Sequence, residues 1–115
     1  MGYGTLEVAR RGGVARVTLD RPEARNAFDD RMVAELTAWA GEAAAGDLRA
    51  AVLGGAGAVF CAGADAAWMA RTAARPREEN ARDAGRLAAM FAALDALPFP
   101  LLARVQGAAL GGGAG

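Results

Sequence analysis

The chain contains no histidine, no lysine and only one cysteine, Cys61, among its 115 residues. Without histidine, a self-contained Ser/His/Asp or Cys/His catalytic set is excluded, and a typical zinc site is disfavoured. The absence of lysine excludes a P-loop, which needs a lysine directly after its glycines. A single cysteine allows no internal disulfide and fits a reducing compartment, so we expect a cytoplasmic protein.

An excess of charge of one sign is also absent, and so are long apolar runs. Thirteen basic residues, all arginine, balance 13 acidic ones, and nothing in that balance favours nucleic acid or an acidic membrane surface as a partner. The longest uncharged run, Ala50–Ala64, contains glycines and is shorter than the ~20 residues that cross a bilayer. Glu7 and Arg10 interrupt any signal-peptide pattern. Hydrophobic residues nevertheless make up 54%, which is typical of a globular domain.

Hydrophobic periodicity predicts strands and helices in an α/β order, with a parallel sheet after an initial hairpin. Alternating or continuous apolar runs predict strands over Thr5–Arg10, Val14–Leu19, Ala50–Leu53 and Leu101–Val105. Apolar residues at spacings of three and four predict helices from Asp29 or Asp30 to about Ala45, and from Glu78 to about Leu97. We expect the strand Ala50–Leu53 to be buried on both faces, as in a sheet covered by helical crossovers.

Two stretches of small residues each follow an apolar run. Val59–Cys61 leads into Ala62–Ala64, where Asp65 is placed to cap a helix, and Leu101–Val105 leads into Gly107–Gly113. Such turns leave backbone N–H groups open to an anionic oxygen, and two of them side by side would form an oxyanion hole. The alternative is that small residues only let helices approach the sheet. A dinucleotide fingerprint is disfavoured because Gly55-Ala56-Gly57 lacks its third glycine.

Three segments, Leu19–Phe28, Phe60–Asp65 and Ala103–Gly113, resemble the motifs of the enoyl-CoA hydratase/isomerase (crotonase) family. Trp68-Met69 together with Glu78–Asn80 resembles the methylglutaconyl-CoA hydratase-like branch of that family. The resemblance implies an α/β fold, the N-terminal part of the crotonase (ClpP/crotonase) ββα spiral. Because the chain has less than half the usual length of such a domain, we expect residues 1–115 to be an incomplete, truncated portion of it.

The resemblance also implies a site for an acyl-CoA. Its oxyanion donors would be the backbone N–H groups of Ala64 and Gly112, which would bind the thioester carbonyl oxygen. The residues implied to contact substrate or coenzyme A are Arg25, Ala27, Ala62, Gly63, Ala64, Asp65, Ala66, Trp68, Leu110, Gly111 and Gly112. Two alternatives stay open, because Arg25 could be a solvated loop arginine and Trp68 could be core. Coenzyme A would enter as part of the substrate, with no separate cofactor and no metal.

Proton transfer is the part that the residues do not supply. Hydratases of this family use two glutamates, and the first would fall at Gly115. Asp65 could substitute as a base, although its expected role is the helix cap. We therefore expect little hydratase activity from residues 1–115 alone, and association through uncovered apolar strands.

The predicted function is hydration or isomerisation of an enoyl-CoA in fatty-acid or branched-chain (leucine) catabolism. The full-length protein would be a homo-oligomer, a trimer or a hexamer, as the resemblance implies. The alternative is a non-catalytic fragment or pseudoenzyme that binds coenzyme A or a partner.

Overall fold

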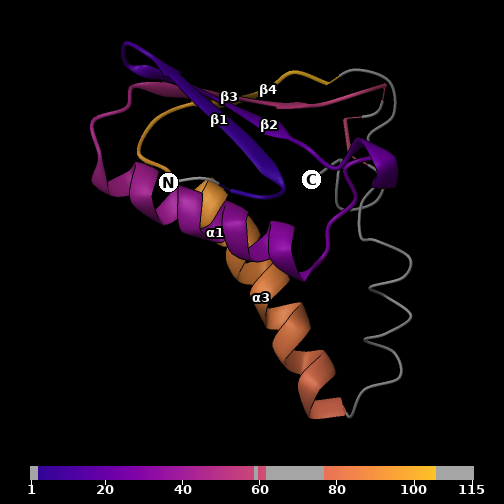
Figure 1. Cartoon of the computed structure of the whole chain (residues 1–115). Coiled ribbons are helices and arrows are strands. Elements are labelled where there is room, and N and C mark those ends of the chain that lie inside the picture. The colour runs from indigo at the N-terminus through magenta and orange to yellow at the C-terminus, as the bar shows by residue number, and fades with distance from the viewer. Residues whose placement is uncertain (1–2, 59, 62–76, 106–115) are drawn as a thin grey trace.

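A four-stranded sheet with helices on one side organises the chain. The computed structural model describes residues 3–58, 60–61 and 77–105. Along the chain these form β1 (Leu6–Arg11), β2 (Val14–Leu19), the 3-10 turn η1 (Pro22–Ala24), α1 (Asp30–Ala45), β3 (Ala50–Gly55), α3 (Arg77–Asp95) and β4 (Leu101–Ala103). The strands lie in the order β1-β2-β3-β4. Only the β1/β2 pair is antiparallel, and α1 and α3 lie on the same side of the sheet (Figure 1). The predicted α/β class is confirmed.

The first two strands form the predicted hairpin. Gly12 takes a left-handed backbone (φ +62°), a conformation that glycine adopts without a Cβ clash. Along β2 the alternate residues Ala15, Val17 and Leu19 are buried, whereas Val14 on the other face is exposed. This two-residue period directs one face of the hairpin toward the helices and leaves the other face uncovered by them.

Helix α1 begins where its cap predicts. Asp29 is the N-cap, and its Oδ1 accepts a hydrogen bond from the backbone N–H of Met32 at 2.9 Å. A cap of this kind contributes about 1 kcal/mol. The helix ends before Gly46, as predicted. Its inward stripe consists of Met32, Val33, Leu36, Trp39, Ala40 and Ala43.

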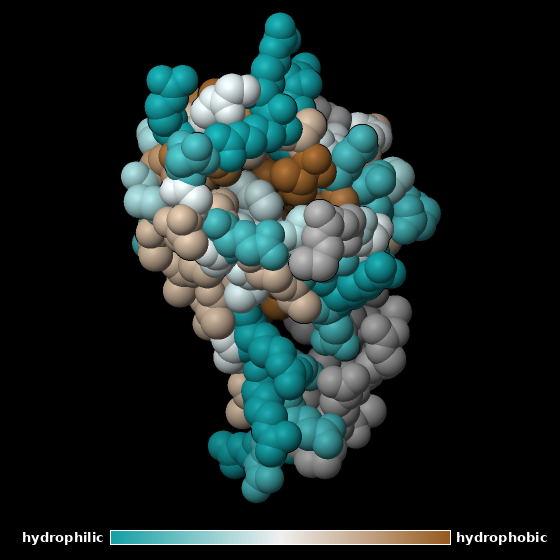
Figure 2. All heavy atoms as spheres, turned by 60° about the vertical axis from the view of Figure 1, so that its left-hand side comes forward, coloured by the Kyte–Doolittle hydropathy of each residue, from teal (hydrophilic) through white to brown (hydrophobic). Residues whose placement is uncertain are grey.

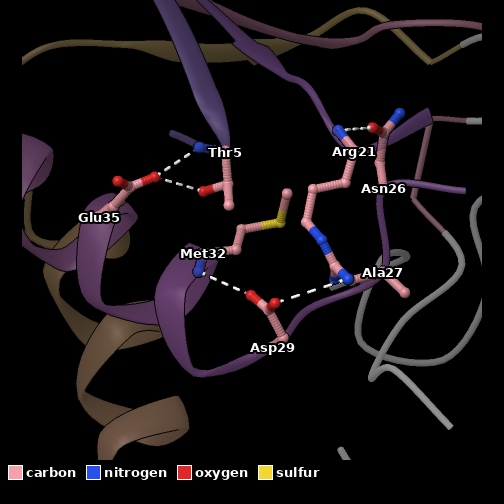
Figure 3. Close-up of polar contacts among 7 residues, drawn as sticks. All are labelled: Thr5, Arg21, Asn26, Ala27, Asp29, Met32 and Glu35. Atoms are coloured by element: carbon pink, nitrogen blue, oxygen red, sulfur yellow. Dashed lines mark hydrogen bonds and ion pairs between the residues drawn. The ribbon is translucent and has the colours of Figure 1, made fainter. Parts of the chain in front are cut away.

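Glu35 of α1 ties the N-terminal segment to the helix (Figure 3). Its carboxylate accepts from the backbone N–H groups of Gly4 (2.8 Å) and Thr5 (2.7 Å) and from the Thr5 hydroxyl (2.5 Å). Burial raises the pKa of Glu35. The hydrogen bonds from Thr5 and Gly4 and the charge of the neighbouring Arg31 lower it by more than burial raises it, so the net pKa lies below its ordinary value.

Helix α3 is divided into a packed half and a projecting half. Met90 is fully buried, and Phe91 meets Phe28 edge to face at 6.0 Å between ring centroids. Other residues of the predicted stripe, such as Leu87 and Leu94, are only partly buried against the core. The N-terminal half extends away from the sheet in Figure 1, and its visible surface in Figure 2 is mostly hydrophilic. The stripe is therefore core packing, with the packing concentrated at one end of the helix.

Strands β3 and β4 differ from their predictions in length and in burial. β3 continues to Gly55, and β4 ends at Ala103 instead of Val105. Ala51 is fully buried, but Val52 and Leu53 are only half-buried, so burial of Ala50–Leu53 on both faces was wrong. In the described part of the chain the helices cover one face of the sheet. The other face and the β4 edge leave Leu102 60% and Val105 55% exposed.

Candidate functional site

Two of the predicted contact residues, Arg25 and Ala27, lie in the loop between β2 and α1. Ala62, Gly63, Ala64, Asp65, Ala66 and Trp68, and also Leu110, Gly111 and Gly112, lie outside the described residues. Both proposed oxyanion donors, Ala64 and Gly112, thus remain predictions. The structure does describe the loop and the strand ends from which these segments continue.

The loop turns through two consecutive left-handed residues. Arg25 has φ +54° and Asn26 has φ +56°, values that cost free energy for most residues with a Cβ and that asparagine tolerates best. The backbone N–H of Arg25 donates to the Pro22 carbonyl (3.1 Å), and that of Asn26 donates to the Arg21 carbonyl (2.8 Å). The tight turn places the Arg25 side chain on the surface.

Asn26 joins this loop to the end of β3. The residue is completely buried. Its Oδ1 accepts from the backbone N–H of Arg21 (2.8 Å), and its Nδ2 donates to the carbonyl of Ala56 (2.8 Å). Its own carbonyl accepts a hydrogen bond from the Cys61 thiol (3.1 Å). Asn26 therefore contacts both its own loop and the two ends of the segment from Ala56 to Cys61, which leads toward Ala64.

The sequence-based predictions assigned no role to Asn26. It stands inside the segment that carries the family resemblance, but two of its partners, Ala56 and Cys61, are 30 and 35 residues away in the chain. An asparagine in a short polar loop is the local signal that could have suggested a left-handed turn residue.

Arg21 connects the same loop to the start of α1. Its Nη1 donates to the Ala27 carbonyl at 2.5 Å, and its Nη2 lies 3.5 Å from Oδ2 of Asp29, the N-cap residue (Figure 3). The Ala27 side chain is buried as well. Arg21 is thus engaged within the protein. The Arg25 side chain is exposed, and its guanidinium forms no ion pair with any carboxylate of the described residues.

Glycines allow the chain after β3 to fold back closely on itself. A Cβ placed on Gly55 would lie 2.6 Å from the Phe60 carbonyl oxygen, so only glycine fits without displacement of backbone. Gly57 has φ +82°, and Ala56 donates its N–H to the Leu19 carbonyl at 2.8 Å. The bend after β3 delivers Phe60 and Cys61 into the core.

Two stretches of small residues, Ala62–Ala64 and Gly107–Gly113, are predicted to form turns, and the strands that precede them, β3 and β4, are parallel neighbours. Leu53 of β3 is paired with Ala103 of β4, and the N–H of Arg104 donates to the Leu53 carbonyl at 2.8 Å. Parallel strands present their carboxyl ends at one edge of the sheet, which is where open α/β sheets bind ligands. Both segments that carry the predicted donors therefore leave the sheet at the same edge.

Comparison with known proteins places this arrangement in a family. A family model described as enoyl-CoA hydratase/isomerase matches residues 9–115. The chain belongs to the enoyl-CoA hydratase/isomerase family. A probable enoyl-CoA hydratase of Rhodobacter capsulatus is 41% identical over 114 residues, which cover 99% of this chain and 43% of that protein. The probable enoyl-CoA hydratase echA6 of Mycobacterium bovis is 38% identical over 108 residues, which cover 94% and 41%.

Solved structures agree with the fold of this family member. An enoyl-CoA hydratase from Shewanella pealeana superposes with a TM-score of 0.90 at 37% identity and covers 95% of this chain and 42% of its own. Pseudomonas aeruginosa AtuE gives a TM-score of 0.91 at 39% identity, with coverage of 95% and 43%. The crotonase fold is therefore confirmed. The chain spans about two-fifths of the length of the relatives that it matches.

The described residues contain neither a cluster of metal-binding side chains nor a membrane-spanning helix. Within 3–58, 60–61 and 77–105, no three metal-binding side chains of the His, Cys, Asp or Glu type lie together. None of the helices in these ranges is both long and apolar enough to cross a bilayer. A groove between α1 and α3 contains none of the predicted site residues; it is lined by Asp30, Val33, Ala34, Thr37, Ala38, Asp83, Arg86 and Ala89.

Proposed function

We propose that this chain binds an acyl-CoA and holds the thioester carbonyl oxygen between the backbone N–H groups of Ala64 and Gly112. The observation that carries the proposal is the parallel pairing of β3 with β4, from which both donor segments leave the sheet at one edge. Membership of the enoyl-CoA hydratase/isomerase family supports an acyl-CoA as the substrate. The reaction would be hydration or isomerisation of the double bond in an enoyl-CoA.

The two N–H groups would act on charge that grows during the reaction. When water adds to the double bond, or when a base removes a neighbouring proton, electron density moves onto the thioester oxygen. Donors fixed at that oxygen stabilise the transition state more than the ground state, and losing one costs about 3–4 kcal/mol in other enzymes. No resident cofactor is part of this proposal, because coenzyme A belongs to the substrate.

The loop between β2 and α1 would bind the other end of the substrate. Its exposed arginine, Arg25, carries a guanidinium that no described carboxylate neutralises. A guanidinium matches the geometry of phosphate oxygens, so Arg25 is proposed to contact the phosphate or adenine end of coenzyme A. Ala27, a buried residue of the same loop, would contact this end of coenzyme A through its backbone.

The finer assignments are proposals of the same kind. The resemblance of Trp68-Met69 and Glu78–Asn80 to the methylglutaconyl-CoA hydratase-like branch favours a branched-chain substrate and a place in leucine catabolism. We further expect a cytoplasmic homotrimer or hexamer for a protein with the whole domain. Calorimetric titration with crotonyl-CoA and with methylglutaconyl-CoA would separate the substrates, since a tenfold preference for the branched ligand supports the branch.

The carbonyl stretch of a bound enoyl-CoA tests the oxyanion donors without requiring turnover. Difference infrared spectroscopy should show a lower stretching frequency in the complex than in water, because hydrogen bonds weaken the C=O bond. Ala64→Pro removes one N–H and should reduce that shift, whereas the matched control Ala64→Gly keeps the N–H and should preserve it. Equal shifts in the two variants, or binding without any shift, would refute the oxyanion proposal.

A further inference from the structure

Asn26 is placed to hold two parts of the proposed acyl-CoA site together. On one side, its Oδ1 accepts from Arg21 N–H within the loop that carries Arg25 and Ala27. On the other side, its Nδ2 donates to the carbonyl of Ala56, which follows β3. Side-chain and backbone contacts of one buried residue therefore span both segments.

The third contact reaches further along the chain. The Asn26 carbonyl accepts from the Cys61 thiol at 3.1 Å, and Cys61 is completely buried. In the sequence, Cys61 precedes Ala64 by three residues. Asn26 thus helps to fix the position of Cys61, and the chain continues from Cys61 to Ala64, the first proposed oxyanion donor.

We propose that Asn26 is a positioning residue, which sets the coenzyme A-binding loop and the backbone leading to Ala64 in one fixed relation. The inference rests on the proposed function. Because its described partners are Arg21, Ala56 and Cys61, Asn26 would act on the geometry of the site and not on the chemistry. Small displacements of groups that hold a substrate are known to reduce catalysis strongly, so the role is measurable.

Only asparagine meets all the requirements at this position. The backbone needs φ +56°, which asparagine tolerates better than other residues with a Cβ. The side chain needs an acceptor toward Arg21 N–H and a donor toward the Ala56 carbonyl. Aspartate supplies the acceptor but would bring an oxygen against that carbonyl, and glycine supplies the backbone conformation but neither hydrogen bond.

Two substitutions separate these requirements. Asn26→Gly keeps the turn and removes both side-chain hydrogen bonds, and Asn26→Asp removes only the donor. We expect each variant to bind crotonyl-CoA about tenfold more weakly than the wild type and to show a smaller carbonyl shift of the bound thioester. Trp39→Phe, in the C-terminal half of α1, is the control for a general loss of stability in the core.

The control should lower the melting temperature but leave both the dissociation constant and the carbonyl shift unchanged. Wild-type affinity and shift in Asn26→Gly, or equal losses in Trp39→Phe, would overturn the positioning role. A wild-type protein that binds no acyl-CoA would overturn the proposed function as well, so the two failures are distinguishable.

Hydrogen exchange on the wild type gives a test that needs no variant to fold. If a fixed arrangement of this loop strengthens ligand binding, then a bound ligand must stabilise that arrangement to the same extent. Crotonyl-CoA should therefore slow exchange at the amides of Arg21, Asn26 and Ala56 at least tenfold. The amides in the middle of α1 should change less. Unchanged exchange at these three amides in the saturated complex would overturn the inference.

Discussion

Among the glycines of the described residues, Gly55 is the position where one added methyl group should do the most damage. A Cβ built there would lie 2.6 Å from the Phe60 carbonyl oxygen and 3.0 Å from the Phe60 Cα. It would also lie 2.9 Å from Nδ2 of Asn26. Two of these three atoms are backbone, which cannot rotate away as the end of a flexible side chain can. Gly55→Ala must therefore move the chain after β3 or displace the Asn26 amide.

The magnitude follows from both consequences. Overpacking of a close-packed interior costs about 1–3 kcal/mol, and a buried amide displaced from its partner costs about 1–3 kcal/mol. The two costs share the same relaxation, so we expect a combined loss of about 2–4 kcal/mol in the free energy of unfolding. For a domain of this size that corresponds to a melting temperature lower by roughly 8–15 °C.

Gly54 provides a matched control from the adjacent position in the same strand. A Cβ at Gly54 would meet no atom within 4 Å, and its backbone is not left-handed. Gly54→Ala should therefore be neutral, or stabilising by about 0.4–1 kcal/mol through the unfolded chain. Thermal unfolding of the two variants, followed by circular dichroism, compares them directly. Equal melting temperatures for Gly55→Ala and Gly54→Ala would refute the close approach of Phe60 to β3.

Three further substitutions test the polar contacts. Asp29→Ala removes the α1 cap and one ion-pair partner of Arg21, and should reduce the free energy of unfolding in urea by about 1–2 kcal/mol; an unchanged midpoint would contradict the cap. The folded pKa of Glu35 is depressed, so its stabilisation is present above the unfolded pKa of about 4.3 and is lost as pH falls through the lower folded value. Glu35→Gln should flatten the acid side of the stability–pH curve, and an equally steep curve would count against the hydrogen-bonded carboxylate. Arg10→Ala breaks an exposed ion pair with Asp47 and should leave the melting temperature almost unchanged, whereas a large drop would show that surface screening is weaker than assumed.

Local patterns in the sequence by themselves determined the hairpin, the start of α1 and the inward stripe of each helix. Asp29 caps α1 because an N-cap side chain reaches an N–H only three residues ahead. Gly12 turns the hairpin for an equally local reason. Such signals act within a few residues, so they can be read without knowing the fold. The family resemblance came from the sequence in the same way, through short motifs.

Tertiary structure alone decided the burial of β3 and the role of Asn26. Whether Val52 and Leu53 are buried depends on which face of the sheet a helix covers, and strand sequence does not state this. The Asn26 side chain donates a hydrogen bond to the Ala56 carbonyl, and the Asn26 carbonyl accepts one from the Cys61 thiol. Position 55 must be glycine because the Phe60 backbone lies too close for a Cβ. Two of these three contacts join residues far apart in the chain, and these two form only when the loop after β2 lies beside the end of β3. The physical reason is that hydrogen-bond partners and close approaches are properties of the folded arrangement, whereas caps and periodicity belong to the chain itself.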